Sequence, residues 1–369
     1  MTNTNRRTAL ALLGAGAGSA ALLPRATQAQ EMPRLRWRLA SSFPKSLNTI
    51  FGATEYFTRR VAQLTEGRFE IRPFAAGEIV PALQVLDAVS TNTMECGHTG
   101  SFYYIGKNPA FAFGTAIPFG MNMRQHNAWL YHGGGNELLN AFYKQYKIHA
   151  IPLGNTGAQM GGWFRKELRS AADLNGLKMR VGGIAGQIMA RLGLVPQQIA
   201  AGDIYTALEK GTIDAAEWVG PFDDEKLGFQ KVAPFYYYPG FNESSTVIHL
   251  FVNQDAWTAL PPLYQAVVET AAAEAHTWMT ARYDAENPAA LRRLLAGGTK
   301  LRAYPSDLMD AAYRTAQALY AELAEKNPEF KTLLASYNAF QALTTPWFQV
   351  AEDSYANFIA RTLRAAAKR

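Results

Sequence analysis

Residues 170–218 read SAADLNGLKMRVGGIAGQIMARLGLVPQQIAAGDIYTALEKGTIDAAEW, and this stretch decides the fold class. Asp173–Gly176 is typical of a turn, and the apolar run after it predicts a short strand, Leu177–Val181, which carries Arg180. The glycine-rich residues 182–186 then open a helix. A strand that leads directly into a helix is typical of α/β architecture.

The same order of elements is expected in the second half of this stretch. Asp203 is placed to cap a helix that ends at Gly211. The core side chains of this helix are expected to be Tyr205 and Leu208.

A strand is expected next, at residues 212–218, with Glu217 and Trp218 at its end. In open α/β sheets, ligands bind beyond the carboxyl ends of the strands. This rule brings Arg180, Glu217 and Trp218 to one cleft.

The chain on either side continues the alternation. Further strands are expected at residues 35–41, 69–74, 94–98, 148–153 and 160–164. The helix between the first two strands stops near Gly67, and its buried face is expected to consist of Ile50, Ala53, Phe57, Val61 and Leu64. Two α/β lobes that the chain crosses more than once fit this pattern better than separate domains in a row.

Helices dominate the remaining segments. One long helix is expected between Arg124 and Tyr146, and another opens at Pro261-Pro262. The face of the second helix is expected to carry Leu263, Val267 and Ala271. From residue 306 to the end the chain is Ala-rich, which predicts a long C-terminal helical extension with breaks near Pro328 and Pro346.

Residues 1–29 have the layout of an export signal. Arg6-Arg7 precedes a weakly apolar stretch, Ala9–Leu23, and Thr27 and Ala29 occupy the expected cleavage-site positions. The paired arginines indicate the Tat route, so we expect cleavage after Ala29 and a periplasmic protein. The apolar stretch is shorter than the roughly twenty residues that span a bilayer. An uncleaved anchor or a basic tail is the alternative.

Composition excludes several classes of function. The 369 residues carry a net charge of +6, three units of which lie in the signal, and the rest is too weakly basic to predict nucleic-acid binding. The single cysteine, Cys96, excludes an intrachain disulfide and a multi-cysteine metal site, and it is expected to be an inert buried thiol. The six histidines are spread too widely to form a local ligand pair. No nucleotide-binding, zinc-protease or serine-hydrolase motif occurs.

Several motifs together resemble the solute-binding proteins of TRAP transporters, the DctP type. They are D-L-x-G-x-K-x-R at Asp173–Arg180, G-x-x-P at Gly193–Pro196, Y-x-A-L-x-x-G-x-I-D-A-A-E at Tyr205–Glu217 and H-L-F-V-N-Q-D-A-W-T-A-L-P at His249–Pro261. The branch that binds α-keto acids (TakP) is the most similar. The segments that carry this closer resemblance are His98–Gly120, Gly154–Phe164 and Tyr236–Glu243.

The resemblance implies a periplasmic-binding-protein-like fold, with two α/β lobes around a ligand cleft. Lobe 1 would comprise residues 30–155 plus about 245–285, and lobe 2 residues 156–244 plus about 286–369, including the C-terminal helices. The implied function is capture of a small 2-oxo or 2-hydroxy monocarboxylate, such as pyruvate, for delivery to the membrane subunits of a TRAP permease. No bond is made or broken.

The matching arginine, Arg180, would form a two-pronged salt bridge with the ligand carboxylate, since a planar guanidinium offers two parallel donors. The alternative is that Arg180 pairs with a structural acid. The Tyr103 hydroxyl is expected within reach of the carboxylate, and Arg165 is the only candidate for a second carboxylate. Further candidates for the ligand pocket are Phe102, Gln159, Asn155, Phe43 and Trp218, of which Phe102 is explained equally well by core packing.

The resemblance also implies a metal ion, Na⁺ or Ca²⁺, that touches ligand and protein. Its ligands would be the side chains of Gln159 and Glu217, the backbone oxygen of Trp218 and, fourth, Glu243. All are hard oxygen donors, which suit these cations. Arg180, Glu217 and a monocarboxylate sum to −1, which Na⁺ balances, whereas adding Glu243 gives −2 and favours Ca²⁺. Ordinary hydrogen bonding is the alternative for Gln159 and Glu243.

Other interpretations remain open at this point. The extension beyond Leu301 implies a homodimer in which a helix crosses to the second subunit, or else a helix folded back on its own lobe. A binding protein of an ABC importer would lack the match at Tyr205–Glu217. An exported metal-dependent enzyme would use Glu217 or Glu243 as a general base on a 2-oxo acid. A sensor subunit that presents its ligand to a receptor would use the same cleft.

Overall fold

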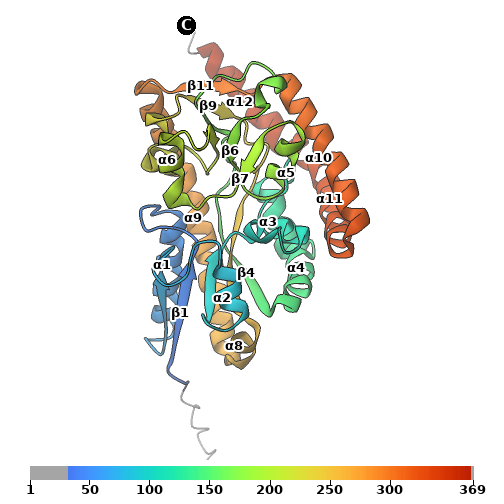
Figure 1. Ribbon diagram of the computed structural model, residues 1–369. Helices are drawn as coiled ribbons and strands as arrows, with labels where there is room; N and C mark the ends of the chain where they lie inside the picture. The colour runs from blue at the N-terminus through green and yellow to red at the C-terminus, as the bar shows by residue number, and fades with distance from the viewer. Residues whose placement is uncertain (1–31, 367–369) are drawn as a thin grey trace, which may run out of the picture. The chain divides into compact units, whose positions relative to one another are not determined.

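The computed structural model describes residues 32–366, and the predicted export signal lies outside them (Figure 1). Two separate sheets organise the described part of the chain. None of its helices is long and apolar enough to cross a membrane.

The first sheet has five strands in the order β2-β1-β3-β10-β4, and with its helices it forms what we call the first lobe. Its strands are β1 (Leu35–Ser41), β2 (Phe69–Phe74), β3 (Cys96–Thr99), β4 (Ile148–Asn155) and β10 (Val247–Asn253). β1 runs parallel to β2 and β3, whereas β10 is antiparallel to both of its neighbours. Every residue of β10, VIHLFVN, is buried, as expected for an interior strand that is covered on both faces.

The second sheet has six strands in the order β11-β9-β5-β8-β6-β7, and with its helices it forms the second lobe. Its strands are β5 (Gly162–Phe164), β6 (Lys178–Arg180), β7 (Val195–Gln197), β8 (Ala215–Ala216), β9 (Phe235–Tyr238) and β11 (Lys300–Ala303). These strands are short. The strand predicted over 212–218 covers only two residues, although the Glu217 amide still donates to the Arg180 carbonyl of β6 at 3.0 Å.

Helices cover both sheets and connect the lobes. Figure 1 labels α1 (Ile50–Leu64), α2 (Val85–Ser90), α3 (Met123–His132), α4 (Gly135–Tyr143), α5 (Gly183–Arg191), α6 (Ala201–Glu209), α8 (Gln254–Ala259), α9 (Pro262–Ala296), α10 (Ser306–Lys326), α11 (Pro328–Phe348) and α12 (Ser354–Ala366); α7 (Pro221–Leu227) packs against α9. The 35-residue α9 contacts β4 and α1 in the first lobe as well as α7 in the second. α10 packs on α5, and α11 packs on α3 and α4. The predicted fold of two α/β lobes with a long helical extension is confirmed.

Several local predictions were wrong. Residues 124–146 form two helices, because α3 ends at Gly133 and Gly134 adopts a left-handed conformation (φ 79°). The buried face of α9 carries Tyr264 and Val268, whereas Leu263 is 57% exposed. Leu64, at the end of α1, is 42% exposed because the helix has already left the core there.

The helix after residue 200 also differs from the prediction. α6 is preceded by Ala200 at its N-cap, so Asp203 lies in the first turn and does not cap the helix. Ile204 and Leu208 are buried, while Tyr205 is half-buried and its hydroxyl donates to Glu209.

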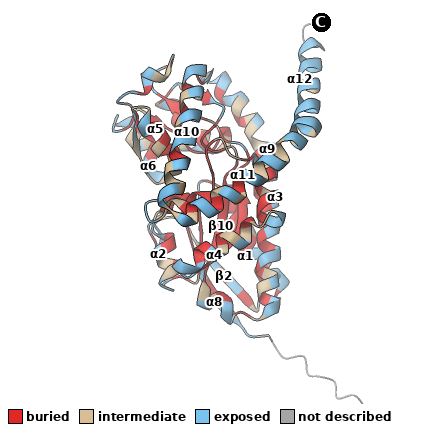
Figure 2. Ribbon diagram, turned by 90° about the vertical axis from the view of Figure 1, so that its right-hand side faces the viewer, coloured by how far each residue is buried: buried red, intermediate tan, exposed pale blue. Residues whose placement is uncertain are grey.

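The C-terminal helices end in an exposed segment. The break before Pro328 is confirmed, but Pro346 lies inside α11, and a π-helical turn at Gln349–Asp353 follows instead. No residue of α12 is buried, and Figure 2 shows this helix standing away from the lobes. α12 is therefore not folded back on its own lobe.

Candidate functional site

A small cavity lies between the two lobes, where strands of both sheets end. Its lining consists of Phe43, Ile50, Phe102, Tyr103, Thr156, Gln159, Arg180, Trp218, Val219, Glu243, Thr246 and Ile248. Its volume of about 20 Å³ exceeds the roughly 10–15 Å³ that one water needs. The cavity is small, and its wall combines apolar side chains with a buried arginine and a buried acid, Arg180 and Glu243.

Strand ends deliver the lining residues. Phe43 follows β1, Phe102 and Tyr103 follow β3, Arg180 is the last residue of β6, and Trp218 follows β8. The strand-end rule brings Arg180 and Trp218 to the cavity, whereas Glu217 does not line it and lies behind it in hydrogen-bond contact with Arg180.

Arg180 is the central cation of the site, and its side chain is only 2% exposed. Its Nη1 donates to Oε2 of Glu217 at 2.9 Å and to the Glu217 backbone oxygen, and its Nε donates to the Ile199 carbonyl at 3.3 Å. The guanidinium carbon lies 4.8 Å from the centre of the Trp218 ring. Among the described residues Nη2 has no hydrogen-bond partner, so one arm of the fork remains free.

Two buried acceptor oxygens at the site are unpaired. Gln159 uses its Nε2 to donate to the hydroxyls of Thr156 (3.1 Å) and Thr246 (2.9 Å), and this orients its amide. Its Oε1, like Oε1 of Glu217, is buried without a hydrogen-bond partner. Buried polar atoms are normally satisfied, and oxygen atoms of these two kinds are ligands of Na⁺ and Ca²⁺. The donor set therefore fits a hard cation.

Two acids share this environment. Glu243 is 4% exposed, and its Oε2 accepts a hydrogen bond from Thr246 at 2.5 Å. Burial raises the pKa of Glu243 to about 7, although the Thr246 hydrogen bond and Arg180 act to lower it. Burial, followed by the charge of Glu243, raises the pKa of Glu217 well above its usual range, and Arg180 lowers it. A single guanidinium does not compensate two buried carboxylates, so the site attracts a further positive charge.

Aromatic rings close the cavity on its other side. The Phe43 ring lies 6.2 Å from the Trp218 ring and 6.4 Å from the Tyr103 ring, and Phe102 lies 4.6 Å from Tyr103. Nε1 of Trp218 is buried without a partner and is a free donor. Tyr104, the third residue of this aromatic run, turns into the core, where its hydroxyl bonds Thr99 and the Leu86 amide.

Two predicted residues lie elsewhere. Asn155 does not line the cavity, because its amide is committed to the hydroxyl of Ser245 (3.1 Å) and the backbone of Gly157 (2.9 Å). Its neighbour Thr156 lines the cavity instead, which the sequence reasoning missed by one position. Arg165 is exposed at the second sheet, and the structure gives it no place at the site.

Thr246 was also missed. It was overlooked because a lone threonine carries no pattern, yet it orients both Gln159 and Glu243. The nearby Glu243 was the only signal in the sequence. Ile50, Val219 and Ile248 complete the apolar part of the wall, and they could not be distinguished from ordinary core residues.

The remaining titratable candidates are structural. Cys96 is buried in β3, as expected, and burial raises the pKa of its thiol. No group of three or more His, Cys, Asp or Glu side chains that could hold a metal ion occurs within residues 32–366. A cation site here thus depends on mixed oxygen ligands, including an amide.

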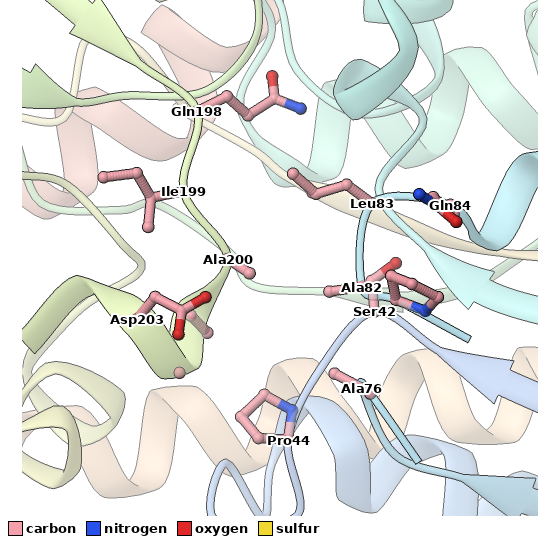
Figure 3. Close-up of a pocket in the computed structure, with 14 residues that line it drawn as sticks. Ser42, Pro44, Ala76, Ala82, Leu83, Gln84, Gln198, Ile199, Ala200 and Asp203 are labelled. Carbon is pink, nitrogen blue, oxygen red and sulfur yellow. The ribbon is translucent and has the colours of Figure 1, made fainter. Parts of the chain in front are cut away.

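A groove of about 660 Å³ lies between loops of the two lobes (Figure 3). Loops of the first lobe with Ser42, Pro44 and Leu83 face the second-lobe segment that carries Gln198 and Asp203. Ser42 and Pro44 flank the cavity residue Phe43 in the chain, but the groove and the cavity share no lining residue.

Two α/β lobes around a small cavity that holds a buried arginine and a buried acid are typical of a protein that binds a small solute. The model of the DctP family, bacterial extracellular solute-binding protein family 7, matches residues 40–327, and the chain belongs to this family. The family resemblance predicted from the motifs is thereby confirmed, and the family is extracytoplasmic. Since its members are solute-binding proteins, the alternative of a metal-dependent enzyme is set aside.

Similar proteins have stated ligands. A monocarboxylate 2-oxoacid-binding periplasmic protein of Nostoc sp. is 52% identical over 89% of this chain and 90% of its own length. A TRAP transporter solute-binding protein of Bordetella bronchiseptica is 54% identical, with a TM-score of 0.89 over 90% of this chain and 99% of that one. Its structure is a mixed-occupancy dimer with copurified calcium and picolinate in one active site and an apo second site. One from Pseudoalteromonas atlantica with sodium and pyruvate is 38% identical (TM-score 0.86, 88% and 99%).

Proposed function

We propose that this protein binds a small 2-oxo monocarboxylate such as pyruvate, together with Ca²⁺, and delivers it to a TRAP permease. The observation that carries the proposal is the pair of buried, unpaired oxygens, Oε1 of Gln159 and Oε1 of Glu217, beside a guanidinium with one free arm. The stated ligands of the similar proteins from Nostoc, Bordetella and Pseudoalteromonas support the same chemistry.

Arg180 provides the anchor for the ligand carboxylate. Its Nη1 stays with Glu217 while Nη2 donates to the ligand, and a charge-assisted hydrogen bond in a buried site is about twice as strong as a neutral one. Tyr103 and the free indole N–H of Trp218 are the further donors toward the ligand oxygens. With a single arginine at the cavity, a monocarboxylate matches the site better than a dicarboxylate.

The cation would be held by the side chains of Gln159, Glu217 and Glu243 and by the backbone oxygen of Trp218. When bound, it supplies the positive charge that the two carboxylates lack. Arg180, two ionised glutamates and a monocarboxylate sum to −2, which Ca²⁺ balances and Na⁺ leaves at −1. Pyruvate and picolinate each carry a donor atom next to the carboxylate, so both chelate a hard cation in the same way.

Closure of the lobes completes binding. We propose that residues 30–155 and about 245–285 move as one lobe, and residues 156–244 and about 286 onward as the other. Closing excludes water, which strengthens the contacts of Arg180 with the ligand. Export by the Tat-type signal at residues 1–29, with cleavage after Ala29, would place the protein in the periplasm beside its permease.

A homodimer is the second part of the proposal. The segment from α11 to α12 exposes a series of large apolar side chains: Leu343, Trp347, Val350, Tyr355, Phe358 and Leu363. Each is more than half exposed, and such a run on one helical segment marks an interaction surface. The partner we propose is the same segment and lobe of a second copy, which the dimer of the similar Bordetella protein supports.

Calorimetry tests the ligand assignment. Pyruvate with Ca²⁺ should bind tightly to the wild-type protein and at least 100-fold more weakly to Arg180→Ala, since a buried acid then loses its partner. Arg165→Ala, an exposed arginine outside the cavity, is the matched control and should bind like wild type. Equal affinity in Arg180→Ala, or no binding by wild type, rejects the proposal.

A further inference from the structure

The two lobes are in close contact at Gly182. This residue joins β6 to α5 in the second lobe, and it faces the ring of Phe102, which lies in the 3-10 turn Ser101–Tyr104 after β3 in the first lobe. A Cβ at Gly182 would lie 2.2 Å from Cε2 of Phe102, and 3.0 and 3.2 Å from the next two ring atoms. Ordinary contact begins at 3.4 Å, so a methyl group overlaps the ring by about 1 Å.

The backbone of Gly182 does not itself require glycine. Its φ of −90° and ψ of 167° are extended values that any residue adopts. The neighbouring Gly183 differs, because its φ of +62° is a left-handed conformation that disfavours a side chain on its own account. Only the contact with the opposite lobe therefore excludes a side chain at residue 182.

The Phe102 ring has no room to give way. The Tyr103 ring centre is 4.6 Å from that of Phe102, so the Phe102 ring is packed against a second ring of its own lobe. Phe102 is 6% exposed. The ring therefore acts as a rigid stop, held by its own lobe, against which the backbone of Gly182 rests.

Ligand-binding groups lie on both sides of this contact. Arg180 is two residues before Gly182, and Tyr103 follows Phe102 directly. A second contact between the lobes lies beside it, where Nε2 of Gln198 donates to the Tyr103 carbonyl at 3.1 Å. A spacer of one methyl group at residue 182 would thus separate Arg180 from Tyr103 and lengthen the Gln198 hydrogen bond.

We propose that Gly182 sets the depth to which the lobes close, and that it does so by allowing the Phe102 ring to reach the backbone of the second lobe. Gly182 is a positioning residue that acts through Arg180, and this role rests on the proposed binding function. Gly182→Ala leaves each lobe intact and holds the closed form open by about 1 Å.

Calorimetry with pyruvate and Ca²⁺ on four variants tests this proposal. Gly182→Ala should bind at least tenfold more weakly than wild type, while its melting temperature without ligand stays within about 2 °C of wild type. Gly106→Ala is the matched control, because a Cβ there meets nothing within 4 Å, and it should bind like wild type. Phe102→Ala removes the ring that Gly182 rests against. The double variant Gly182→Ala/Phe102→Ala should therefore bind pyruvate with the same affinity as Phe102→Ala alone.

Three results would overturn the proposal. The first is a wild-type affinity for pyruvate in Gly182→Ala. The second is a loss of affinity on adding Gly182→Ala to Phe102→Ala that equals its loss in the wild-type background. The third is a Gly182→Ala protein that is unfolded without ligand. If wild type binds no pyruvate, the proposed function is wrong. The role of Gly182 in lobe closure is then tested separately by small-angle X-ray scattering. The radius of gyration of Gly182→Ala must exceed that of wild type under the conditions in which wild type is most compact, and equal radii reject the inference.

Discussion

Replacing Glu243 by glutamine should change the cation that binds with the ligand. Glutamine keeps an oxygen for the Thr246 hydroxyl, which donates to Glu243 Oε2 at 2.5 Å, and it removes one negative charge. Glu217, Arg180 and a monocarboxylate then sum to −1 in place of −2. Na⁺ balances this sum, while Ca²⁺ leaves an uncompensated positive charge in a site where Arg180 and Glu217 are at most 2% exposed.

The size of the effect follows from burial. A buried charge that loses its partner costs about 3–5 kcal/mol, and each 1.4 kcal/mol corresponds to a factor of ten in affinity. We therefore expect pyruvate binding in Ca²⁺ to weaken by about 10²- to 4 × 10³-fold in Glu243→Gln, and binding in Na⁺ to be retained or improved.

The assay is calorimetric titration of pyruvate into protein stripped by a chelator, in buffers with either cation. Elemental analysis of the bound metal accompanies it. Glu325→Gln, an exposed acid on α10, is the control and should keep the wild-type preference. A Glu243→Gln protein that still prefers Ca²⁺ by the wild-type factor would refute the reasoning that charge balance selects the cation.

Three further predictions concern anchoring, pH and assembly. Arg180→Lys should weaken pyruvate binding by about 10–100-fold, because a lysine cannot hold Glu217 and the ligand with two separate arms; unchanged affinity in calorimetry contradicts this. Burial lowers the pKa of His98 to about 3. Below about pH 6.5 His98 is therefore protonated in the unfolded chain but stays neutral in the folded chain, so the free energy of unfolding falls as the pH drops. In chemical denaturation, the difference in free energy of unfolding between wild type and His98→Gln should decrease by about 2–3 kcal/mol from pH 7 to pH 4.5. A difference that does not change with pH contradicts this prediction. In light scattering Phe358→Asp should be a monomer, whereas Leu64→Asp, also on an exposed apolar position, should stay a dimer; a dimeric Phe358→Asp rejects the proposed interface.

Strand positions were predictable where a short apolar run is bounded by turns. Leu35–Ser41 and Phe69–Phe74 agree with the predicted ranges at both ends. Helix register was less predictable, since α9 buries Tyr264 rather than Leu263, and a helix that packs against both lobes has no single apolar stripe to read. The three glycines at 133–135 divide one predicted helix into two, a local effect that outweighed the apolar periodicity of the segment.

The candidate site was predictable in part from strand ends. That rule alone brings Arg180, Glu217 and Trp218 together, whereas Gln159 and Glu243 lie in loops whose course no local pattern determines, and they were found only through the family resemblance. The sequence predicted Asn155 as a pocket residue, but its neighbour Thr156 lines the cavity. Successive residues of an extended chain point to opposite sides, so an error of one position reverses the side. In the structure Nη1 of Arg180 pairs with Glu217, and the contact of Arg180 with a ligand carboxylate stays a prediction.

A crystal structure of the protein grown with pyruvate and Ca²⁺ tests the central claim most directly. We expect one cation at about 2.3–2.6 Å from Oε1 of both Gln159 and Glu217, with the pyruvate carboxylate bonded to Nη2 of Arg180. Pyruvate bound without a cation, or a cation that leaves these two oxygens unpaired, would contradict it.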